Sequence, residues 1–243
     1  KYTSHEIEGM KKMELSVIES SDISYYPSSY EIEQIRTFLP DAKIRQVPVY
    51  LYDIQDMPVH KDFENSREII FVGSAHGPNL DGLKWFLNDI YPYITDRIPD
   101  LVLNIVGSSL SEEIRSISSK NVIVHSYISE EELSELYASS RLSIAPLRYG
   151  AGIKGKVIEA IFHGTPVLTT PIGAEGLFVD GEIIRVATDA RNFADTFLEM
   201  YFDENLWIDL TRKCQNFIHN DFTFARAEAI FKDDIDNGYY SNE

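Results

Sequence analysis

The sequence contains little cysteine, few basic residues and no long hydrophobic stretch. Its single cysteine, Cys214, excludes an internal disulfide bond and a metal centre built from several thiolates, which fits a reducing compartment. No apolar run approaches the ~18 residues that a membrane span needs, and no basic-then-apolar leader stands at the N-terminus. We therefore expect a cytoplasmic location, with no membrane association indicated.

Basic residues are outnumbered, with 22 Lys and Arg against 39 Asp and Glu and a formal net charge of -17. Nucleic acid and anionic membranes bind basic surfaces, so neither is expected as the main partner. The 44% hydrophobic and 25% charged fractions are those of a globular protein. A small anion can still bind where cations gather locally.

From Glu68 onward, apolar strand-like runs alternate with helix-like runs. The strands are predicted at 68–72, 101–106, 121–125, 142–147, 166–170 and 183–187, and the helices near 79–95, 110–118, 130–139, 153–163 and 191–203. This alternation predicts an α/β fold with a doubly wound, Rossmann-like parallel sheet covered on both faces. Ligands bind such sheets at the carboxyl ends of the strands, where Gly73-Ser74 and Gly107-Ser108 would lie.

The remaining residues predict a small additional α/β segment and two closing helices. Helices near 5–20 and 30–39 and strands within 22–29 and 43–51 precede a polar, patternless stretch, 53–67, interpreted as a linker. The closing helices fall near 205–219 and 224–236. The expected domains are 1–65, 66–221 and 222–243. Because the chain starts at Lys1 and not at Met, we expect a fragment or a processed chain.

The stretch from Arg148 to Leu177 contains the main candidate site. Gly150, Gly152 and Gly155 spell G-x-G-x-x-G between a strand and a helix, which is the form of a dinucleotide-binding fingerprint. Two details disfavour that interpretation. The strand before the motif is about the fourth of its domain instead of the first, and the next strand ends without an acid for a ribose hydroxyl.

Charge suggests another interpretation of the same loop. No acidic residue occurs between positions 136 and 158, whereas four basic ones do: Arg141, Arg148, Lys154 and Lys156. Cations at the positive end of a helix cost ~0.3–1 kcal/mol each unless an anion is bound. A phosphate or diphosphate on the amides of Gly152 and Ile153 would supply it. Two lysines in a solvated loop explain the pattern equally well.

Acids and histidines near this loop allow both structural and functional roles. Glu159 could form a surface ion pair with Lys156 or accept two vicinal sugar hydroxyls. His163 fits a helix C-cap, and Asn79 fits a helix N-cap beside His76, a weak binding candidate. The acid pair Asp234 and Asp236 resembles a metal site but fits better a solvated helix face.

Several motifs together resemble one enzyme family. The run GAGIKGKVIEAIFHGTPVLTTPIGAEGL is similar to the signature of GT-B-fold glycosyltransferases of group 1, also called family four. Three earlier segments also resemble this family, in the right order: FVGS at 71–74, PDLVLNIVGS at 99–108 and residues 122–147. The resemblance covers 66–221. It implies a two-domain enzyme that moves a sugar from a nucleotide diphosphate to an acceptor. This chain would supply the donor-binding C-terminal domain and a remnant of the N-terminal, acceptor-binding domain.

The resemblance also implies roles for individual residues. Glu159 matches the second glutamate of the family's E-x7-E motif, which binds the ribose, whereas the first glutamate is replaced by Ala151. The diphosphate would be bound by Lys154, Lys156, Gly73, Ser74 and the amides of Gly152 and Ile153. Tyr127 and Ile128 would pack on the base. Arg148 would make a weaker contact with a phosphate. Lys154, Lys156 and Glu159 are the residues expected to act in catalysis.

The implied donor is a UDP-, GDP- or other nucleotide-diphosphate sugar, with no cofactor and no metal. The acceptor would be a glycan or a lipid-linked molecule, bound mainly by the missing N-terminal domain, as in polysaccharide biosynthesis. Transfer would retain the stereochemistry at the sugar carbon, a point that Ala151 leaves open, and the fragment alone would transfer poorly or not at all. Two alternatives are a nucleotide-sugar epimerase of the same fold and a non-catalytic nucleotide-sugar-binding module.

Overall fold

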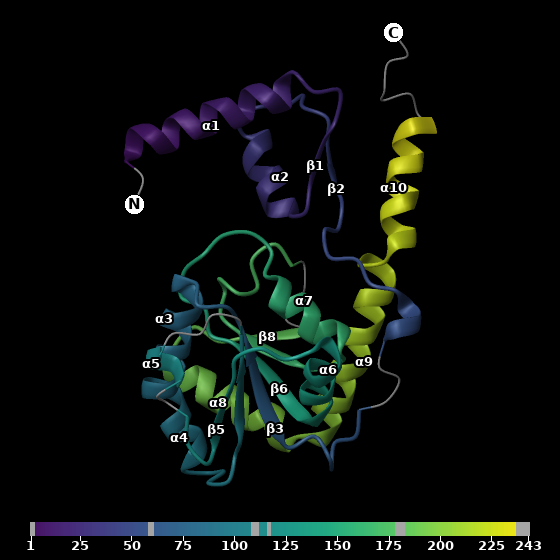
Figure 1. Ribbon diagram of the computed structural model, residues 1–243. Coiled ribbons are helices and arrows are strands. Elements are labelled where there is room, and N and C mark those ends of the chain that lie inside the picture. Colours follow the sequence, from purple (N-terminus) through teal and green to yellow (C-terminus); the bar gives the residue numbers. More distant parts are fainter. Residues whose placement is uncertain (1–2, 58–60, 108–111, 116–117, 178–182, 237–243) are drawn as a thin grey trace. The chain divides into compact units, whose positions relative to one another are not determined.

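The computed structural model describes residues 3–57, 61–107, 112–115, 118–177 and 183–236 (Figure 1). The chain divides into two compact units, one formed by 1–51 with 221–243 and the other by 52–220. The division after Leu51 differs from the expected domain boundary at residue 65. Each unit is described by itself.

The larger unit contains a six-stranded, fully parallel sheet. Its strands stand in the order β5-β4-β3-β6-β7-β8 and span Glu68–Val72 (β3), Leu103–Val106 (β4), Val122–His125 (β5), Ser140–Ala145 (β6), Val167–Thr169 (β7) and Ile184–Val186 (β8). Counted within this unit, the order is 3-2-1-4-5-6, the doubly wound arrangement that the sequence predicts. The direction of winding reverses between β3 and β6.

Helices cover both faces of this sheet, as Figure 1 shows. They span Gly77–Trp85 (α3), Tyr91–Thr95 (α4), Glu112–Arg115 (α5), Glu130–Ser139 (α6), Gly155–Phe162 (α7), Ala190–Phe202 (α8) and Glu204–Asp221 (α9). Helix α4 contacts α8, whereas α6 and α7 pack on the strands from the other side. The buried core includes Phe71, Ile105, Leu142, Phe197 and Trp207.

The single helix expected over 79–95 consists of three parts. A five-residue π-helix, η2 (Phe86–Ile90), separates α3 from α4. Pro92 stands in the first turn of α4 and has no N–H to donate, so a regular helix could not continue through it with all its hydrogen bonds. The interruption therefore has a local cause in the sequence.

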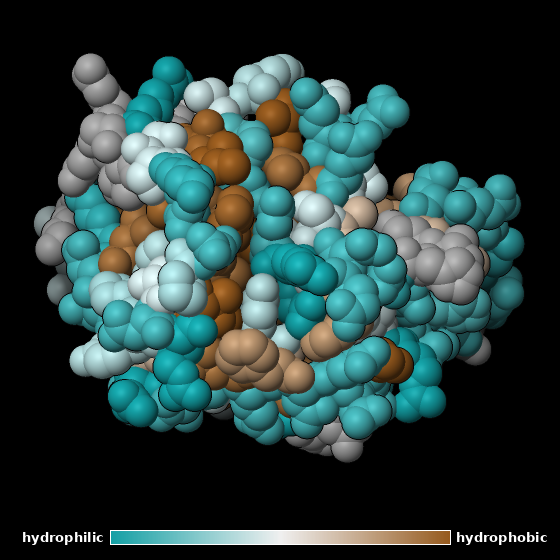
Figure 2. Space-filling model, turned by 90° about the horizontal axis from the view of Figure 1, so that it is seen from below, coloured by the Kyte–Doolittle hydropathy of each residue, from teal (hydrophilic) through white to brown (hydrophobic). Residues whose placement is uncertain are grey.

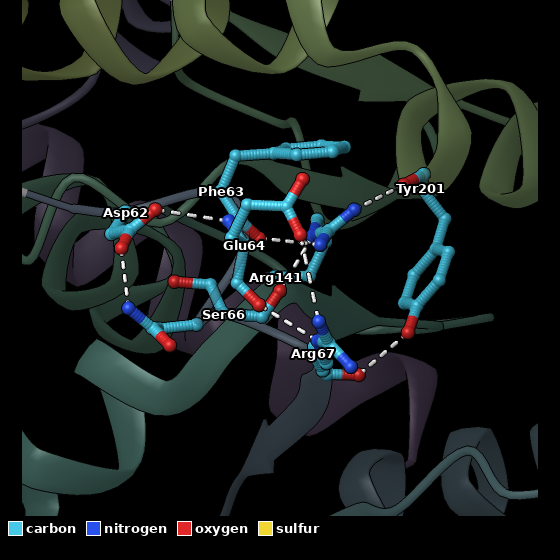
Figure 3. Close-up of polar contacts among 8 residues, drawn as sticks. Asp62, Phe63, Glu64, Ser66, Arg67, Arg141 and Tyr201 are labelled. Atoms are coloured by element: carbon cyan, nitrogen blue, oxygen red, sulfur yellow. Dashed lines mark hydrogen bonds and ion pairs between the residues drawn. The ribbon is translucent and has the colours of Figure 1, made fainter.

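The stretch expected to be a linker, 53–67, belongs to the larger unit, and Figure 3 shows contacts that some of its residues make with Arg141. The guanidinium of Arg141, on β6, donates to the carbonyls of Phe63 at 2.5 Å and Ser66 at 2.5 Å. It also donates to the carbonyl of Tyr201 at 2.7 Å and stacks on the Phe63 ring at 3.4 Å from the centroid. Most described side chains of the segment are exposed, as expected of a linker, but its backbone supplies acceptors to a buried cation. It also contains a short 3-10 helix, η1 (Ile54–Asp56).

The smaller unit contains the additional α/β segment that the sequence predicts. Strands β1 (Ser24–Tyr26) and β2 (Ile44–Gln46) pair in parallel, with helices α1 (Ser4–Glu19), α2 (Ser29–Arg36) and α10 (Phe224–Asp236). Its core includes Ile18, Ile32, Ile35 and Ile44.

Of the two acids of α10, Asp234 does not lie on a solvated face, so the expectation for this residue was wrong. The Asp234 side chain is fully buried and accepts hydrogen bonds from Arg45 at 2.5 Å and from the hydroxyl of Tyr25 at 2.9 Å. Asp236 is exposed, as expected. Asp234 therefore joins α10 to β1 and β2 within the smaller unit.

Figure 2 shows one face of the molecule, on which hydrophilic side chains predominate and apolar ones are interspersed. Such a mixture is normal for a globular surface. Among the described residues, none of the helices has the length and apolar character needed to cross a bilayer.

Candidate functional site

The candidate site lies where the carboxyl ends of β3 and β6 meet, at the reversal of the sheet order. β3 leads into Gly73-Ser74, and β6 leads through the glycine-rich loop into α7. The two loops meet through Asn79, whose Nδ2 donates to the Ser74 carbonyl at 3.0 Å and whose Oδ1 accepts a hydrogen bond from Lys156 Nζ. The fold thus brings Lys156 to the Gly73-Ser74 backbone.

Gly73 is required by this close approach. A Cβ added there would lie 2.8 Å from Lys156 Nζ and 2.9 Å from Asn79 Cγ, closer than real side chains come. Only a glycine lets the lysine and the amide lie directly over the end of β3. The expected role of Gly73 and Ser74 in binding a phosphate stays a prediction, and the close approach of Lys156 to this backbone is the observation that bears on it.

Helix α3 is placed against the site by a second glycine. A Cβ on Gly82 would lie 2.3 Å from the carbonyl oxygen of Pro146, directly after β6. The close contact between Gly82 and Pro146 places Asn79 over the end of β3 and Asp81 beside Arg148, which precedes the glycine-rich loop. Asn79, expected as a helix cap, is instead the bridge between the two loops, and His76 occupies the cap position without a side-chain cap bond.

Lys156 is a partly buried cation next to neutral groups. Its described partners are the Asn79 amide and the Phe71 ring, whose centroid lies 5.0 Å from Nζ. Burial, with a smaller effect of nearby Lys154, lowers the pKa of Lys156 to about 8. A cation in this position gains more from a bound anion than one already paired with a carboxylate.

Lys154 stands just outside the helix instead of in its first turn. It is the N-cap residue of α7, with an extended backbone, and its Nζ donates to the carbonyl of Gly152. Gly152 has a φ of 74°, which favours glycine, and its N–H donates to Glu175 Oε1 at 2.7 Å. In this structure a carboxylate from the loop after β7 therefore occupies the Gly152 amide that we expect to bind a diphosphate.

Glu159 lies one helical turn beyond Lys156, but it does not share a partner with it. Its Oε2 accepts a hydrogen bond from the hydroxyl of Tyr137 at 3.3 Å. Burial raises the pKa of Glu159, and the bond from Tyr137 opposes that rise. A fixed, partly buried carboxylate is suited to accepting neighbouring hydroxyls.

The other two basic residues of the acid-free window are engaged elsewhere. Arg148 forms a two-bond pair with Asp81, at 2.8 and 2.5 Å, and lies over the Trp85 ring. Arg141, in the interior strand β6, is buried and donates to three backbone carbonyls (Figure 3). Of the four cations, Lys154 donates to the loop carbonyl of Gly152 and Lys156 donates to the bridging amide of Asn79.

Tyr127 and Ile128 follow β5, which β4 separates from β3. Tyr127 is 92% exposed, and Ile128 is partly buried just before the first turn of α6. Their exposure leaves them accessible to a ligand. Gly107 directly follows β4, the strand between β3 and β5. Ser108 lies outside the described residues.

Sequence reasoning missed Asn79 as a bridge, Gly82 as the contact of α3, and the partners Tyr137 and Glu175. Each contact joins residues more than 20 positions apart, so no local spacing could have shown it. Within the described part of the chain, no three His, Cys, Asp or Glu side chains are arranged to hold a metal ion.

Comparisons with known proteins show the family and the fold of this chain. The sequence model described as "Glycosyl transferases group 1" matches residues 66–203. A Klebsiella pneumoniae protein described as an uncharacterized 44.6 kDa protein in the cps region is 31% identical over 175 residues, covering 68% of this chain and 45% of that protein.

Two solved structures share the fold at low sequence identity. Sucrose-phosphate synthase from Thermosynechococcus elongatus superposes with a TM-score of 0.77 at 17% identity, over 96% of this chain and 63% of that one. A mutant of S. aureus TarM, solved with Fondaparinux, alpha-GlcNAc-glycerol and UDP, gives a TM-score of 0.75 at 14% identity, over 95% of this chain and 46% of that one. The chain thus spans about half the length of the Klebsiella relative and of TarM. By its family match, this chain belongs to the glycosyl transferases group 1 family.

Proposed function

We propose that this chain forms the donor-binding part of a glycosyltransferase that uses a nucleotide-diphosphate sugar. The observation that carries the proposal is the approach of Lys156 to the Gly73-Ser74 backbone at the point where the sheet order reverses, with Glu159 one helical turn further along α7. Family membership supports it, and UDP is present in the related TarM complex.

In this proposal the diphosphate lies between the Gly73-Ser74 backbone and the start of α7. Lys156 offers a cation with a neutral partner, and the first amides of the helix offer a positive dipole end. Binding of the diphosphate at the Gly152 amide would replace the Glu175 carboxylate there. Lys154, whose Nζ already points back to the loop at Gly152, would add a second positive charge.

The chemistry assigned to these residues is electrostatic. As the bond between sugar and diphosphate breaks, negative charge grows on the leaving nucleoside diphosphate, and Lys154, Lys156 and the helix amides would offset it. No metal ion is needed for this role. Glu159 would hold the ribose hydroxyls, and Tyr127 and Ile128 would pack on the base. Residues that bind the glycan or lipid-linked acceptor would come from another part of the enzyme.

Ala151 bears on the choice of sugar. It replaces the glutamate that the resemblance assigns to the donor sugar, and it is exposed at the tip of the glycine-rich loop. Retention at the sugar carbon is the proposed outcome. An epimerase of this fold would need catalytic carboxylates and histidines at the cleft. Of the three histidines that could serve, His125 contacts Asn104 at 2.9 Å and His163 stacks on the buried Tyr137 ring, so His76 alone is exposed beside the loop.

Calorimetric titration with UDP, GDP and their sugars tests the proposal. The wild type should bind at least one nucleoside diphosphate, Glu159→Ala should bind it at least several-fold more weakly, and the control Glu199→Ala, an exposed position on α8, should match the wild type. Absence of binding by the wild type would contradict the proposed function. Binding that survives Glu159→Ala unchanged would contradict the ribose assignment alone.

A further inference from the structure

A group of buried polar side chains lies behind Glu159, and the donor-site proposal assigns no role to it. Its central member is Tyr137, near the end of α6, which has no exposed surface and donates its hydroxyl to Glu159 Oε2 at 3.3 Å. Burial, followed by the charge of Glu159, raises the pKa of Tyr137, so the hydroxyl keeps its proton and remains a donor.

The Tyr137 ring is held in one orientation from several sides. His163 stacks on it with 4.5 Å between ring centroids and 12° between planes. Burial, with a smaller effect of Lys61, lowers the pKa of His163 to about 4, so this stacking partner is neutral near pH 7. Because the ring is fully enclosed, its hydroxyl cannot turn away from Glu159 without disturbing the core.

The backbone of Tyr137 is anchored as well. Thr165 Oγ1, beside the start of β7, donates to the Tyr137 carbonyl at 3.5 Å and accepts a hydrogen bond from Lys61 Nζ at 2.6 Å. Lys61 Nζ also donates to the carbonyl of Ser140 at 2.7 Å. Residues from three separate segments therefore fix the end of α6 at the level of Glu159.

A glutamate needs such support to recognise two hydroxyls at once. Its side chain has three rotatable bonds, and a carboxylate can accept vicinal hydroxyls only when both oxygens face them. One hydrogen bond to Oε2 leaves Oε1 and the second lone pair of Oε2 open. A fixed donor behind the carboxylate removes rotational freedom before the ligand arrives.

We propose that Tyr137 is a positioning residue, whose buried hydroxyl orients the Glu159 carboxylate toward the two adjacent ribose hydroxyls of a nucleoside diphosphate. This inference rests on the proposed function. It gives Tyr137 a role in telling ribose from deoxyribose: removal of its hydroxyl weakens the binding of ligands that carry both hydroxyls and spares ligands that lack one.

The variant Tyr137→Phe removes only the hydroxyl and keeps the ring and its stacking on His163. Calorimetry would measure UDP and 2′-deoxy-UDP, or the guanosine pair, with wild type, Tyr137→Phe, Glu159→Ala and the double variant. Tyr91→Phe is the matched control, because Tyr91 is also an inward-facing tyrosine whose hydroxyl donates, to the carbonyls of Leu101 and Asn121.

We expect Tyr137→Phe to weaken binding of the ribonucleotide roughly three- to tenfold, the range of one ordinary intramolecular hydrogen bond, and to leave binding of the deoxyribonucleotide unchanged. The ratio of the two affinities should fall, and Tyr137→Phe should add nothing once Glu159 is alanine. Tyr91→Phe should leave the ratio at its wild-type value.

An unchanged ratio in Tyr137→Phe, or equal weakening of both ligands, would show a merely structural role and overturn the inference while leaving the proposed function intact. Failure of the wild type to bind either ligand would overturn both. If Tyr137→Phe does not fold, 3-fluorotyrosine at position 137 keeps the hydroxyl and makes it a stronger donor. The ratio should then rise, and a constant ratio would overturn the inference.

Discussion

If Lys156 binds the diphosphate as proposed, donor binding should depend on pH. The pKa of Lys156 is about 8 because this lysine is buried and close to Lys154. A diphosphate binds the protonated lysine, so above this pKa each binding event must also take up a proton. The terminal phosphate of a nucleoside diphosphate has its last pKa near ~6, so its charge is already constant there.

The size of the effect follows from the fraction of protonated lysine. With a pKa of about 8, that fraction is about nine-tenths at pH 7 and about one-tenth at pH 9, so the affinity should fall about tenfold, or ~1.4 kcal/mol. The sign is fixed: the folded-state pKa is lowered and the bound anion raises it again, so affinity is lost as pH rises and not as it falls.

Calorimetry at constant ionic strength, from pH 6.5 to 9.5 in two buffers of different ionisation enthalpy, gives both the affinity and the protons taken up. Lys156→Met should bind more weakly and show a much flatter profile, whereas Lys120→Met, at an exposed position, should follow the wild type. An equal slope in Lys156→Met, or affinity that increases up to pH 9, would refute the assignment of Lys156 to the diphosphate.

Three further predictions concern stability. Burial lowers the pKa of Lys61 to about 7. At pH values between this pKa and that of the unfolded chain, the unfolded protein binds more protons than the folded one. Stability should therefore rise with pH by up to ~1.4 kcal/mol per unit relative to Lys61→Met, and parallel urea-unfolding profiles of the two proteins would contradict this. Gly82→Ala should lose ~1–3 kcal/mol and weaken nucleotide binding, because its Cβ meets the Pro146 carbonyl. Gly9→Ala is the control, because open space surrounds Gly9, and thermal unfolding should show it to be neutral or stabilising. An equal change of stability in Gly82→Ala and Gly9→Ala would refute the packing argument. Asp234→Ala should lose ~2–3 kcal/mol by chemical denaturation, because Arg45 and Tyr25 lose a buried acceptor. Asp236→Ala should change little, and a similar loss in both would count against the Asp234 contact.

The strands could be predicted because their signal is local. Each core strand of the larger unit is a short apolar run that ends in a loop or a turn, so the sequence was enough to predict all six and their parallel arrangement. The helix α6 carries its own start signal, a capping box between Ser129 and Glu132. The position of the glycine-rich loop at the carboxyl end of β6 followed from the same alternation.

The failures come from residues whose partners are distant in sequence. Residues 53–67 have the composition of a linker, yet the carbonyls of Phe63 and Ser66 surround the Arg141 guanidinium. Asp234 has the spacing of a helix surface, yet it meets Arg45, 189 positions away. Polarity alone does not show whether a side chain faces water or a buried partner, and only the fold decides between them.

The same distinction explains how a chain with a net charge of -17 can offer a site for an anion. Four basic residues in an acid-free window suggest a positive patch, but Asp81 neutralises Arg148 and the core surrounds Arg141. The proposed site depends less on the number of cations than on the surroundings of Lys156, which contacts an amide and an aromatic ring. Lys156 carries its positive charge next to the Gly73 backbone. A long polyanion would also meet the surrounding acidic surface, whereas a diphosphate is small enough to meet only the lysines. The acidic surface and the basic loop therefore favour the same kind of ligand.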